Sequence, residues 1–285
     1  MVRADRIPPT ALVLVAVSSV QFGAAFAKSI FDEVGPGGTV FLRVLFAAVV
    51  LIAVWRPAVR GRSRADWRLI VLFGVSLGAM NLAYYESLER IPLGIAVTFE
   101  FVGPLGVAIA SSRRLLDLAW VVLAAAGIVL LSDFGQADLD GLGVALALLA
   151  GGFWAAYILL SARVGRTFPG GSGLALAMVA AAALLAPVGV ADAGSDLLVP
   201  GVLAVAAAVA MLSSAIPYTL EMEALRRMPA GVFGVMMSTE PAVAALAGFI
   251  VLDEGLATRE LVAILLVVAA SAGAARNARV PPRDA

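Results

Sequence analysis

The chain of 285 residues is 62% hydrophobic and 14% charged, with a mean hydropathy of +1.00 and no net charge. Soluble domains hold about 45–50% apolar and about 25% charged residues, so this composition excludes an ordinary soluble protein and indicates an integral membrane protein. Cysteine and histidine are absent, which argues against a zinc site, a thiol nucleophile or an imidazole base. We therefore expect no metal site and no cofactor.

Taken in chain order, ten stretches are apolar enough and, at about 20 residues, long enough to cross a bilayer as helices. We expect an all-α membrane protein whose ten transmembrane helices run over residues 10–30, 37–55, 68–88, 92–111, 116–132, 141–162, 173–191, 198–222, 230–251 and 260–275. The first span follows Arg3 and Arg6 as in a signal peptide. Its apolar run of about 18 residues exceeds the usual 7–15, so we expect it to be retained.

The basic residues fall mostly on one side of these spans. With the N-terminus in the cytoplasm, 16 of the 20 lysines and arginines lie in cytoplasmic segments, namely Arg3, Arg6, Arg56, Arg60, Arg62, Arg64, Arg68, Arg113, Arg114, Arg163, Arg166, Arg226, Arg227, Arg276, Arg279 and Arg283. The opposite side holds only Arg90 and Arg259, together with acidic residues that include Asp32, Glu33, Asp133, Asp138, Asp140, Asp192, Asp196, Asp253 and Glu254. Because cytoplasmic loops of membrane proteins are enriched in Lys and Arg, the sequence predicts a multi-pass protein with both termini in the cytoplasm.

The chain repeats itself at a constant offset of 137 residues. The matching pairs are Glu86/Glu223, Leu88/Leu225, Arg90/Arg227, Pro92/Pro229, Gly94/Gly231 and Pro104/Pro241. This offset maps the third and fourth spans onto the eighth and ninth, so we predict two five-helix units over residues 1–135 and 136–285. Because five is an odd number, the second unit enters the membrane upside down, as in many secondary transporters whose substrate site lies between the halves. Ancient duplication alone would leave the same pattern.

Four charged residues fall inside or at the edge of predicted spans: Glu100, Glu240, Arg43 and Lys28. Charges inside a membrane are costly and usually face a cavity, where they handle substrate or protons. Structural ion pairs, or a protonated Glu bonded to a backbone carbonyl, would explain the same residues. Pro104 cannot donate to the carbonyl of Glu100, so we also predict a kink and a spare acceptor beside that carboxylate.

Polar side chains recur at helical spacing in several spans. Asn81 with Tyr84, Trp154 with Tyr157, and Tyr218 with Glu221 each share a helix face at i, i+3, and Tyr218 and Glu221 occupy the repeat positions of Asn81 and Tyr84. Gln21 on the first span could join them. Two interpretations stay open, because Tyr and Trp line pockets but also mark the membrane–water interfaces.

Several strings give the sequence a resemblance to a known family. They are Ala27-Lys28-Ser29, Gly74-Val75-Ser76-Leu77-Gly78, Pro92-Leu93-Gly94-Ile95-Ala96-Val97, Ser111-Ser112-Arg113-Arg114, Trp120-Val121-Val122-Leu123-Ala124, Pro217-Tyr218-Thr219-Leu220-Glu221-Met222 and Ser238-Thr239-Glu240-Pro241. With ten helices in two inverted copies and Trp154 early in the second, the chain resembles the EamA branch of the drug/metabolite transporter superfamily. More narrowly it is similar to the bacterial threonine/homoserine exporters. The resemblance implies an inner-membrane exporter of small amino acids driven by the proton gradient.

The charges suggest how such an exporter would work. Glu100 or Glu240 would hold the ammonium of a zwitterionic amino acid or a proton, and Arg43 or Lys28 would hold its carboxylate. The expected partners are the amino acid, protons and the lipid bilayer, with no nucleic acid, and a homodimer stays open. The cargo could instead be another small metabolite, a drug or a nucleotide-linked sugar. An intramembrane enzyme would need a nucleophile or cofactor motif that the sequence lacks, and a purely structural protein would leave the carboxylates unexplained.

Overall fold

A computed structural model describes residues 7–28, 31–91, 93–112, 114–131, 140–240, 242–243 and 258–277. Within these ranges the chain is helical and contains no strand, as the sequence predicts. Five helical stretches are long and apolar enough to cross a membrane: Glu33–Trp55, Arg64–Leu88, Gly141–Thr167, Ser172–Leu198 and Pro200–Leu225. Shorter apolar helices cover Pro9–Val20, Ile95–Ser111, Leu115–Leu130 and Leu261–Ala274. These nine stretches fall on nine of the ten predicted spans.

The first half of the chain supplies six helices. They are α1 (Pro9–Lys28), α2 (Phe31–Trp55), α3 (Arg64–Leu88), α4 (Leu93–Glu100), α5 (Val102–Ser111) and α6 (Leu115–Leu131). The predicted span 92–111 is thus divided at Phe101, which confirms the kink expected from Pro104. Helix α3 begins earlier than predicted because Ser63 and Asp66 form a capping box, each side chain accepting from the other residue's backbone N–H.

The second half begins with α7 (Gly141–Thr167), α8 (Ser172–Ala193) and a 3₁₀ turn, η2 (Gly194–Leu198). The next span is built from α9 (Pro200–Ala210), a π-helical turn η3 (Met211–Ala215) and α10 (Ile216–Leu225). Helices α11 (Ala230–Met237) and α13 (Thr258–Asn277) follow. The second part of the predicted span 230–251, including residues 244–251, lies outside the described residues.

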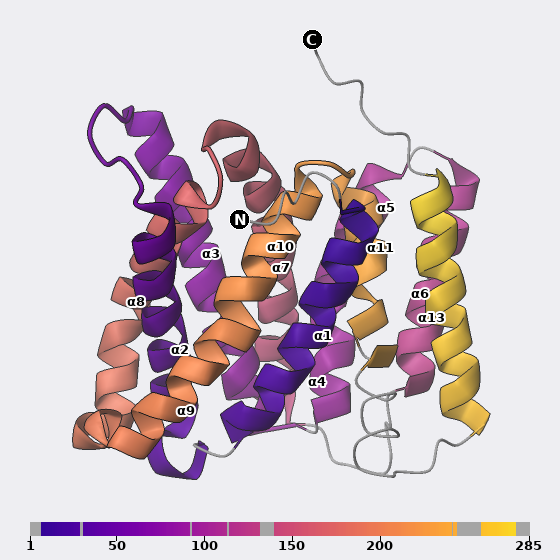
Figure 1. Ribbon diagram of the computed structural model, residues 1–285. Coiled ribbons are helices and arrows are strands. Elements are labelled where there is room, and N and C mark those ends of the chain that lie inside the picture. Colours follow the sequence, from indigo (N-terminus) through magenta and orange to yellow (C-terminus); the bar gives the residue numbers. More distant parts are fainter. Residues whose placement is uncertain are drawn as a thin grey trace.

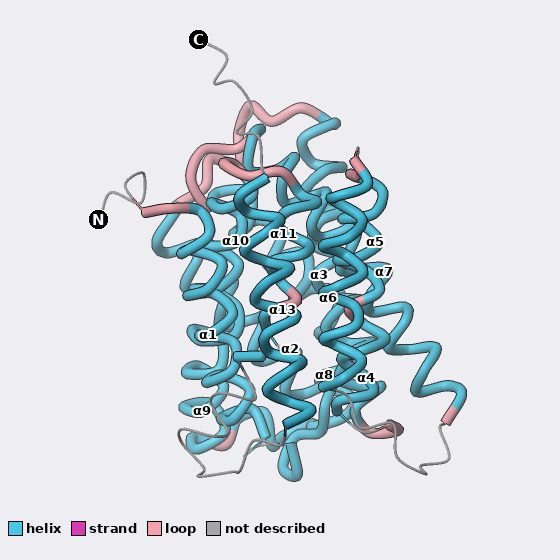
Figure 2. Tube along the Cα trace, turned by 90° about the vertical axis from the view of Figure 1, so that its right-hand side faces the viewer, coloured by secondary structure: helices cyan, strands magenta, loops and turns pink. Residues whose placement is uncertain are grey.

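The helices run up and down in one bundle (Figures 1 and 2). Helices α2 and α3 pack against α8, α3 also packs against α7, α1 against α10, and α6 against α13. Helix α1 begins and α13 ends at the same end of the bundle (Figure 1). Large apolar side chains also cover outward faces, among them Val54, Leu72, Val122 and Leu265, as contact with lipid hydrocarbon requires.

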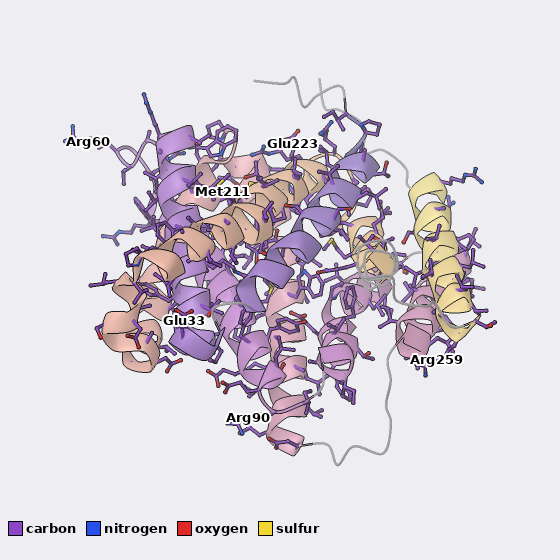
Figure 3. The ribbon with its side chains drawn as sticks, turned by 60° about the horizontal axis from the view of Figure 1, so that its bottom comes forward. Glu33, Arg60, Arg90, Met211, Glu223 and Arg259 are labelled. Atoms are coloured by element: carbon purple, nitrogen blue, oxygen red, sulfur yellow. The ribbon has the colours of Figure 1, made fainter. Side chains whose placement is uncertain are left out.

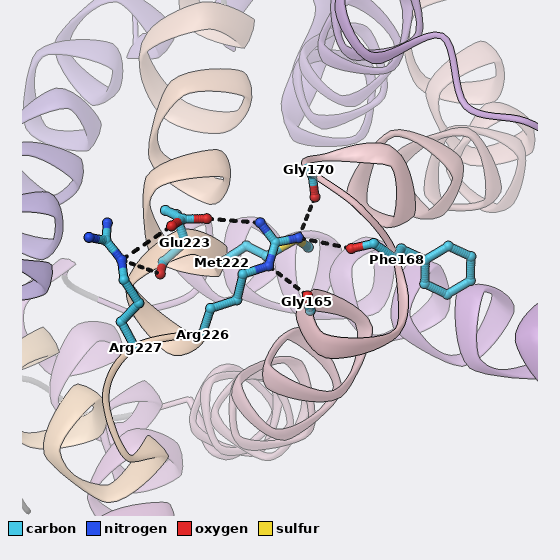
Figure 4. Close-up of polar contacts among 7 residues, drawn as sticks. All are labelled: Gly165, Phe168, Gly170, Met222, Glu223, Arg226 and Arg227. Atoms are coloured by element: carbon cyan, nitrogen blue, oxygen red, sulfur yellow. Dashed lines mark hydrogen bonds and ion pairs between the residues drawn. The ribbon is translucent and has the colours of Figure 1, made fainter. Parts of the chain in front are cut away.

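One end of the bundle is tied together by Arg226, at the end of α10 (Figure 4). Its Nε donates to the Gly165 carbonyl at 2.6 Å, and its Nη2 donates to the carbonyls of Phe168 (3.1 Å) and Gly170 in the α7–α8 connection. Glu223 accepts from Arg226 Nη1 at 2.8 Å and pairs with Arg227 Nε at 3.2 Å. The hydrogen bonds from Arg226 satisfy carbonyls at and just after the C-terminal end of α7, which no N–H of that helix can reach.

Candidate functional site

Among the residues whose burial is described, Arg43 of α2 is the one Lys or Arg that is buried, with 6% of the residue exposed to solvent. Its Nη1 donates to the Tyr85 hydroxyl at 3.0 Å, and its Nη2 donates to Oδ1 of Asn81. The guanidinium also lies over the Tyr85 ring, 5.3 Å from its centroid. Its Nε is buried without a hydrogen-bond partner among the described residues. Arg43 is therefore held firmly on one edge while a donor on the other edge remains unused.

Asn81 joins Arg43 to the second half of the chain. Its Nδ2 donates to the Leu77 carbonyl at 2.7 Å and to the Tyr218 hydroxyl at 3.2 Å. Asn81 and Tyr218 are the residues that the offset of 137 pairs with each other. This contact joins α3, in the first half of the chain, to α10, in the second half.

A buried carboxylate lies beyond Tyr218, on the same helix α10. Glu221 is 2% exposed, and its Oε2 accepts a hydrogen bond from the Tyr157 hydroxyl at 2.8 Å. The Tyr157 ring stacks on Phe73 with centroids 5.6 Å apart and lies 5.5 Å from the Tyr218 ring. Hydrogen bonds and aromatic contacts thus link Arg43, Asn81, Tyr218, Tyr157 and Glu221 in one polar cluster inside an apolar bundle.

The two predicted carboxylates lie near this cluster. Glu100 ends α4 and is partly exposed, and its charge interacts with Glu240 and with Arg43. Glu240 follows α11 and is also partly exposed. Tyr84 lies within electrostatic range of both carboxylates and of Arg43. Three elements far apart in the sequence therefore bring two acidic side chains and one basic side chain to a shared region.

Close helix packing fixes the position of Glu100. Helix α7 crosses the α4–α5 break at Gly151, where a Cβ would lie 2.6 Å from the Glu100 carbonyl oxygen. The next residue after Glu100, Phe101, is buried and packs edge-on against Trp154 of α7 with ring centroids 4.9 Å apart. Trp154 therefore supports the break from which Glu100 projects, and its buried position disfavours the membrane-interface interpretation.

The structure brings most of the predicted site residues together and adds three that the sequence did not predict. The structure gathers Glu100, Glu240, Arg43, Asn81, Tyr84, Trp154, Tyr157, Tyr218 and Glu221 around one region of the bundle. Gln21 and Lys28 belong to α1, but their side chains lie outside the described part of the chain. Tyr85, Phe73 and Phe101 were not predicted. Tyr85 follows Asn81 at i+4 and Phe73 precedes it by eight residues, so helical spacing could have found both.

The model of the EamA-like transporter family matches twice, over residues 9–132 and 141–276. The chain belongs to the EamA-like transporter family. Its members are transporters, so this protein is a membrane transporter of a small molecule and not an enzyme. Among described residues, no group of acidic side chains is arranged to hold a metal ion.

Several known bacterial proteins are similar to this chain over most of its length. The threonine/homoserine exporter RhtA of Salmonella typhimurium (strain SL1344) is 44% identical over 278 residues, covering 96% of this chain and 94% of that protein. RhtA of Escherichia coli (strain K12) is 45% identical, covering 95% and 92%. The uncharacterized transporter YwfM of Bacillus subtilis (strain 168) is 25% identical, covering 80% of each. A crystal structure that is 22% identical superposes with a TM-score of 0.77, covering 94% of this chain and 98% of its own, which supports the fold.

Proposed function

We propose that this protein exports small amino acids of the threonine and homoserine kind across the bacterial inner membrane, in exchange for protons. Two relatives that align over nearly the whole chain are named threonine/homoserine exporters. The observation that carries the proposal is Arg43, a buried guanidinium with an unused Nε, close to two carboxylates. An amino acid is a zwitterion, so a site with both signs of charge complements each end of it.

We further propose that residues 1–135 and 136–285 form two inverted five-helix copies, giving ten transmembrane helices in all. The bounds of α4 and α11 support this, because Leu93 and Ala230, and likewise Glu100 and Met237, lie 137 residues apart. The two separate family matches divide the chain at the same place. In such folds the substrate binds near the bilayer midplane between the halves, and alternating access follows when one half rocks against the other.

Both termini lie in the cytoplasm in this proposal. Figure 3 shows Arg60 and Glu223 at one end of the bundle, and Arg90 and Arg259 at the other. The end with Arg60 carries most of the described arginines, including those of the α2–α3 connection and of the ends of α7 and α10. By the positive-inside rule this end faces the cytoplasm.

The proposed mechanism assigns a task to each charge. Arg43 donates Nε–H to the substrate carboxylate while Asn81 and Tyr85 hold its other edge. Glu100 or Glu240 accepts the substrate ammonium, and a proton from outside releases it by neutralising the carboxylate. Because proton and ammonium compete for one carboxylate, exchange needs no further coupling element. Lys28 and Gln21 are proposed to line the same cavity, with Tyr84, Trp154, Tyr157, Tyr218 and Glu221 shaping it around the short substrate side chain.

Counterflow into proteoliposomes tests this proposal. Purified protein is reconstituted and loaded with unlabelled amino acids, and uptake of labelled threonine, homoserine, other amino acids and a cationic drug is measured with and without a pH gradient. We expect threonine or homoserine counterflow that a pH gradient accelerates. Counterflow of the drug or of another metabolite alone would replace the substrate class while keeping the family.

A charge-neutral variant tests the role of the carboxylate. Glu100→Gln should abolish pH-driven efflux from loaded vesicles, because an amide neither binds a proton at this position nor pairs with an ammonium. Glu89→Gln, at an exposed position after α3, is the matched control and should behave as wild type. Normal pH-driven efflux by Glu100→Gln would remove Glu100 from the mechanism.

A further inference from the structure

The span that carries Tyr218 and Glu221 is interrupted just before them by the π-turn η3, which begins at Met211 (labelled in Figure 3). The Ile216 N–H donates to the Met211 carbonyl, five residues back. In the same register, the donor for the next carbonyl, that of Leu212, would be residue 217. That residue is Pro217, which has no N–H. The sequence therefore opens the helix at this turn and removes the peptide donor for one carbonyl.

A side chain from another helix supplies the missing donor. The hydroxyl of Ser19, on α1, donates to the Leu212 carbonyl at 2.6 Å. One turn further along α1, Gly23 lies against Ser213, and a Cβ there would meet the Ser213 side chain. Ser213 and Ser214 are buried within this contact. The absence of a side chain at Gly23 lets α1 approach the π-turn closely enough for the Ser19 bond to form.

The neighbouring Ser18 shows that this contact is specific to Ser19. The Ser18 hydroxyl donates to the Leu14 carbonyl of its own helix at 2.9 Å. Serine hydroxyls in helices commonly bond the carbonyl four residues back in this way. Ser19 instead reaches a residue 193 positions away in the chain. The two adjacent serines thus make the same type of hydrogen bond, Ser18 within its own helix and Ser19 to another helix.

The π-turn sets the direction in which the site residues point. A π-turn holds one residue more than an α-turn, which rotates everything after it by about 100° around the helix axis. Tyr218 and Glu221 follow it directly on α10 and reach Asn81 and Tyr157. The corresponding part of the first half, around Met80, has no proline and belongs to the uninterrupted helix α3. The π-turn is therefore a feature of the half that supplies Tyr218 and Glu221.

We propose that Ser19 is a positioning residue of the transport site: by bonding the Leu212 carbonyl it holds the π-turn in the register that aims Tyr218 and Glu221 at Asn81 and Tyr157. The proposal rests on the proposed function in that these residues belong to the site. Without the Ser19 bond the π-turn relaxes, Tyr218 and Glu221 rotate away from their partners, and substrate binding weakens.

Transport kinetics with three variants tests this role. Ser19→Ala should raise the KM for threonine about three- to tenfold, the effect of one lost hydrogen bond, with little change in maximal rate. Ser18→Ala, which removes the local bond, should keep the wild-type KM, and Ser19→Thr, which keeps a hydroxyl, should restore it. Equal KM values for Ser19→Ala and Ser18→Ala at equal protein level would overturn the proposal.

Two further measurements do not depend on the substrate. Amide hydrogen exchange over residues 211–221 should be about three- to tenfold faster in full-length Ser19→Ala than in Ser18→Ala. Among the described residues, the Ser19 hydroxyl is the one side-chain donor from another helix to a carbonyl of the π-turn, and Ser19→Ala removes it. Unchanged exchange would overturn the positioning role even if no amino acid is transported by wild type. In Pro217→Ala, a peptide N–H becomes available to Leu212, so the added effect of Ser19→Ala should largely disappear. An undiminished effect in that background would place Ser19 elsewhere in the mechanism.

Discussion

Replacing Arg43 by lysine is the sharpest test of the proposed site, because it keeps the charge and removes the planar fork. In the structure Nη1 and Nη2 of the guanidinium donate hydrogen bonds to Tyr85 and Asn81, and Nε is left to donate to a ligand. A lysine ammonium is a compact point charge that cannot reproduce this division of donors between two fixed partners and a ligand. We therefore expect Arg43→Lys to bind substrate poorly although the charge remains.

The size of the effect follows from the contacts. Hydrogen bonds to charged groups contribute about 1.5–3 kcal/mol each, and truncating one partner of a buried charge pair costs about 2–5 kcal/mol. A loss of about 2 kcal/mol corresponds to roughly a 30-fold rise in KM. Arg43→Gln removes the charge as well, leaves Glu100 without its nearby cation, and should lower efflux further.

The assay is threonine counterflow in proteoliposomes at several substrate concentrations, normalised to the amount of folded protein. Tyr85→Phe is the matched control, because it removes one of the two side-chain acceptors of Arg43 and keeps the ring beneath the guanidinium. It should raise KM only about fivefold, as expected for about 1 kcal/mol. A wild-type KM for Arg43→Lys would refute the assignment of Nε to the substrate carboxylate.

Three other predictions concern stability, read as thermal unfolding in detergent. Tyr157→Phe should destabilise the fold by about 1–3 kcal/mol, because the buried Glu221 carboxylate loses a donor at 2.8 Å; unfolding at the wild-type temperature would contradict the importance of this bond. Gly151→Ala should cost about 1–3 kcal/mol by overpacking against the Glu100 carbonyl, whereas Gly152→Ala, with open space around its Cβ position, should be neutral or slightly stabilising. Arg226→Lys should destabilise by about 1–2 kcal/mol and expose the α7–α8 connection to protease, while lysine at the exposed arginines of α7 should have no such effect.

Hydrophobic length alone predicted most of the helices, because only a helix satisfies its backbone groups in lipid. The break at Phe101 also followed from the sequence, since Pro104 must free a carbonyl in any helix. The π-turn at Met211 did not follow, although Pro217 is just as visible. A proline can be accommodated by a kink or by a wider turn, and the choice depends on Ser19 and Gly23 of another helix. Such long-range contacts leave no local signal.

For the proposed site, too, the sequence predicts what depends on local spacing and does not predict what depends on contacts between helices. Periodicity placed Asn81 and a tyrosine on one face of α3, but the spacings i+3 and i+4 both lie on that face. Arg43 bonds Tyr85, whereas Tyr84 lies near the carboxylates, so the two tyrosines contact the proposed site through different neighbours. The approach of α2 to α3 decides which tyrosine meets Arg43. Cost arguments for buried charge, by contrast, need no information about partners, and they predicted Arg43, Glu100, Glu240 and Lys28 as site residues from the sequence alone.

The proposed repeat sharpens the argument for a zwitterionic substrate. If the two copies had remained identical, every charge in the site would have a like charge related to it by the two-fold axis, and both ends of the substrate would meet the same sign. At the offset of 137, Arg43 pairs with Ala180, Glu100 with Met237, Glu240 with Gly103 and Glu221 with Tyr84.

None of these four charges has a charged counterpart, although Glu86 and Glu223, near the C-terminal ends of α3 and α10, still match. In the proposed repeat, the symmetry of charge is therefore lost inside the membrane, where a molecule with two opposite ends would bind, whereas the pair Glu86/Glu223 keeps it near the ends of the helices. A neutral apolar drug would give no reason for this pattern. Restoring the symmetry of charge with Ala180→Arg should impair threonine counterflow far more than Ala180→Leu, because only arginine adds a second cation. Equal impairment by the two variants would show that the site does not distinguish the two ends of its substrate by charge.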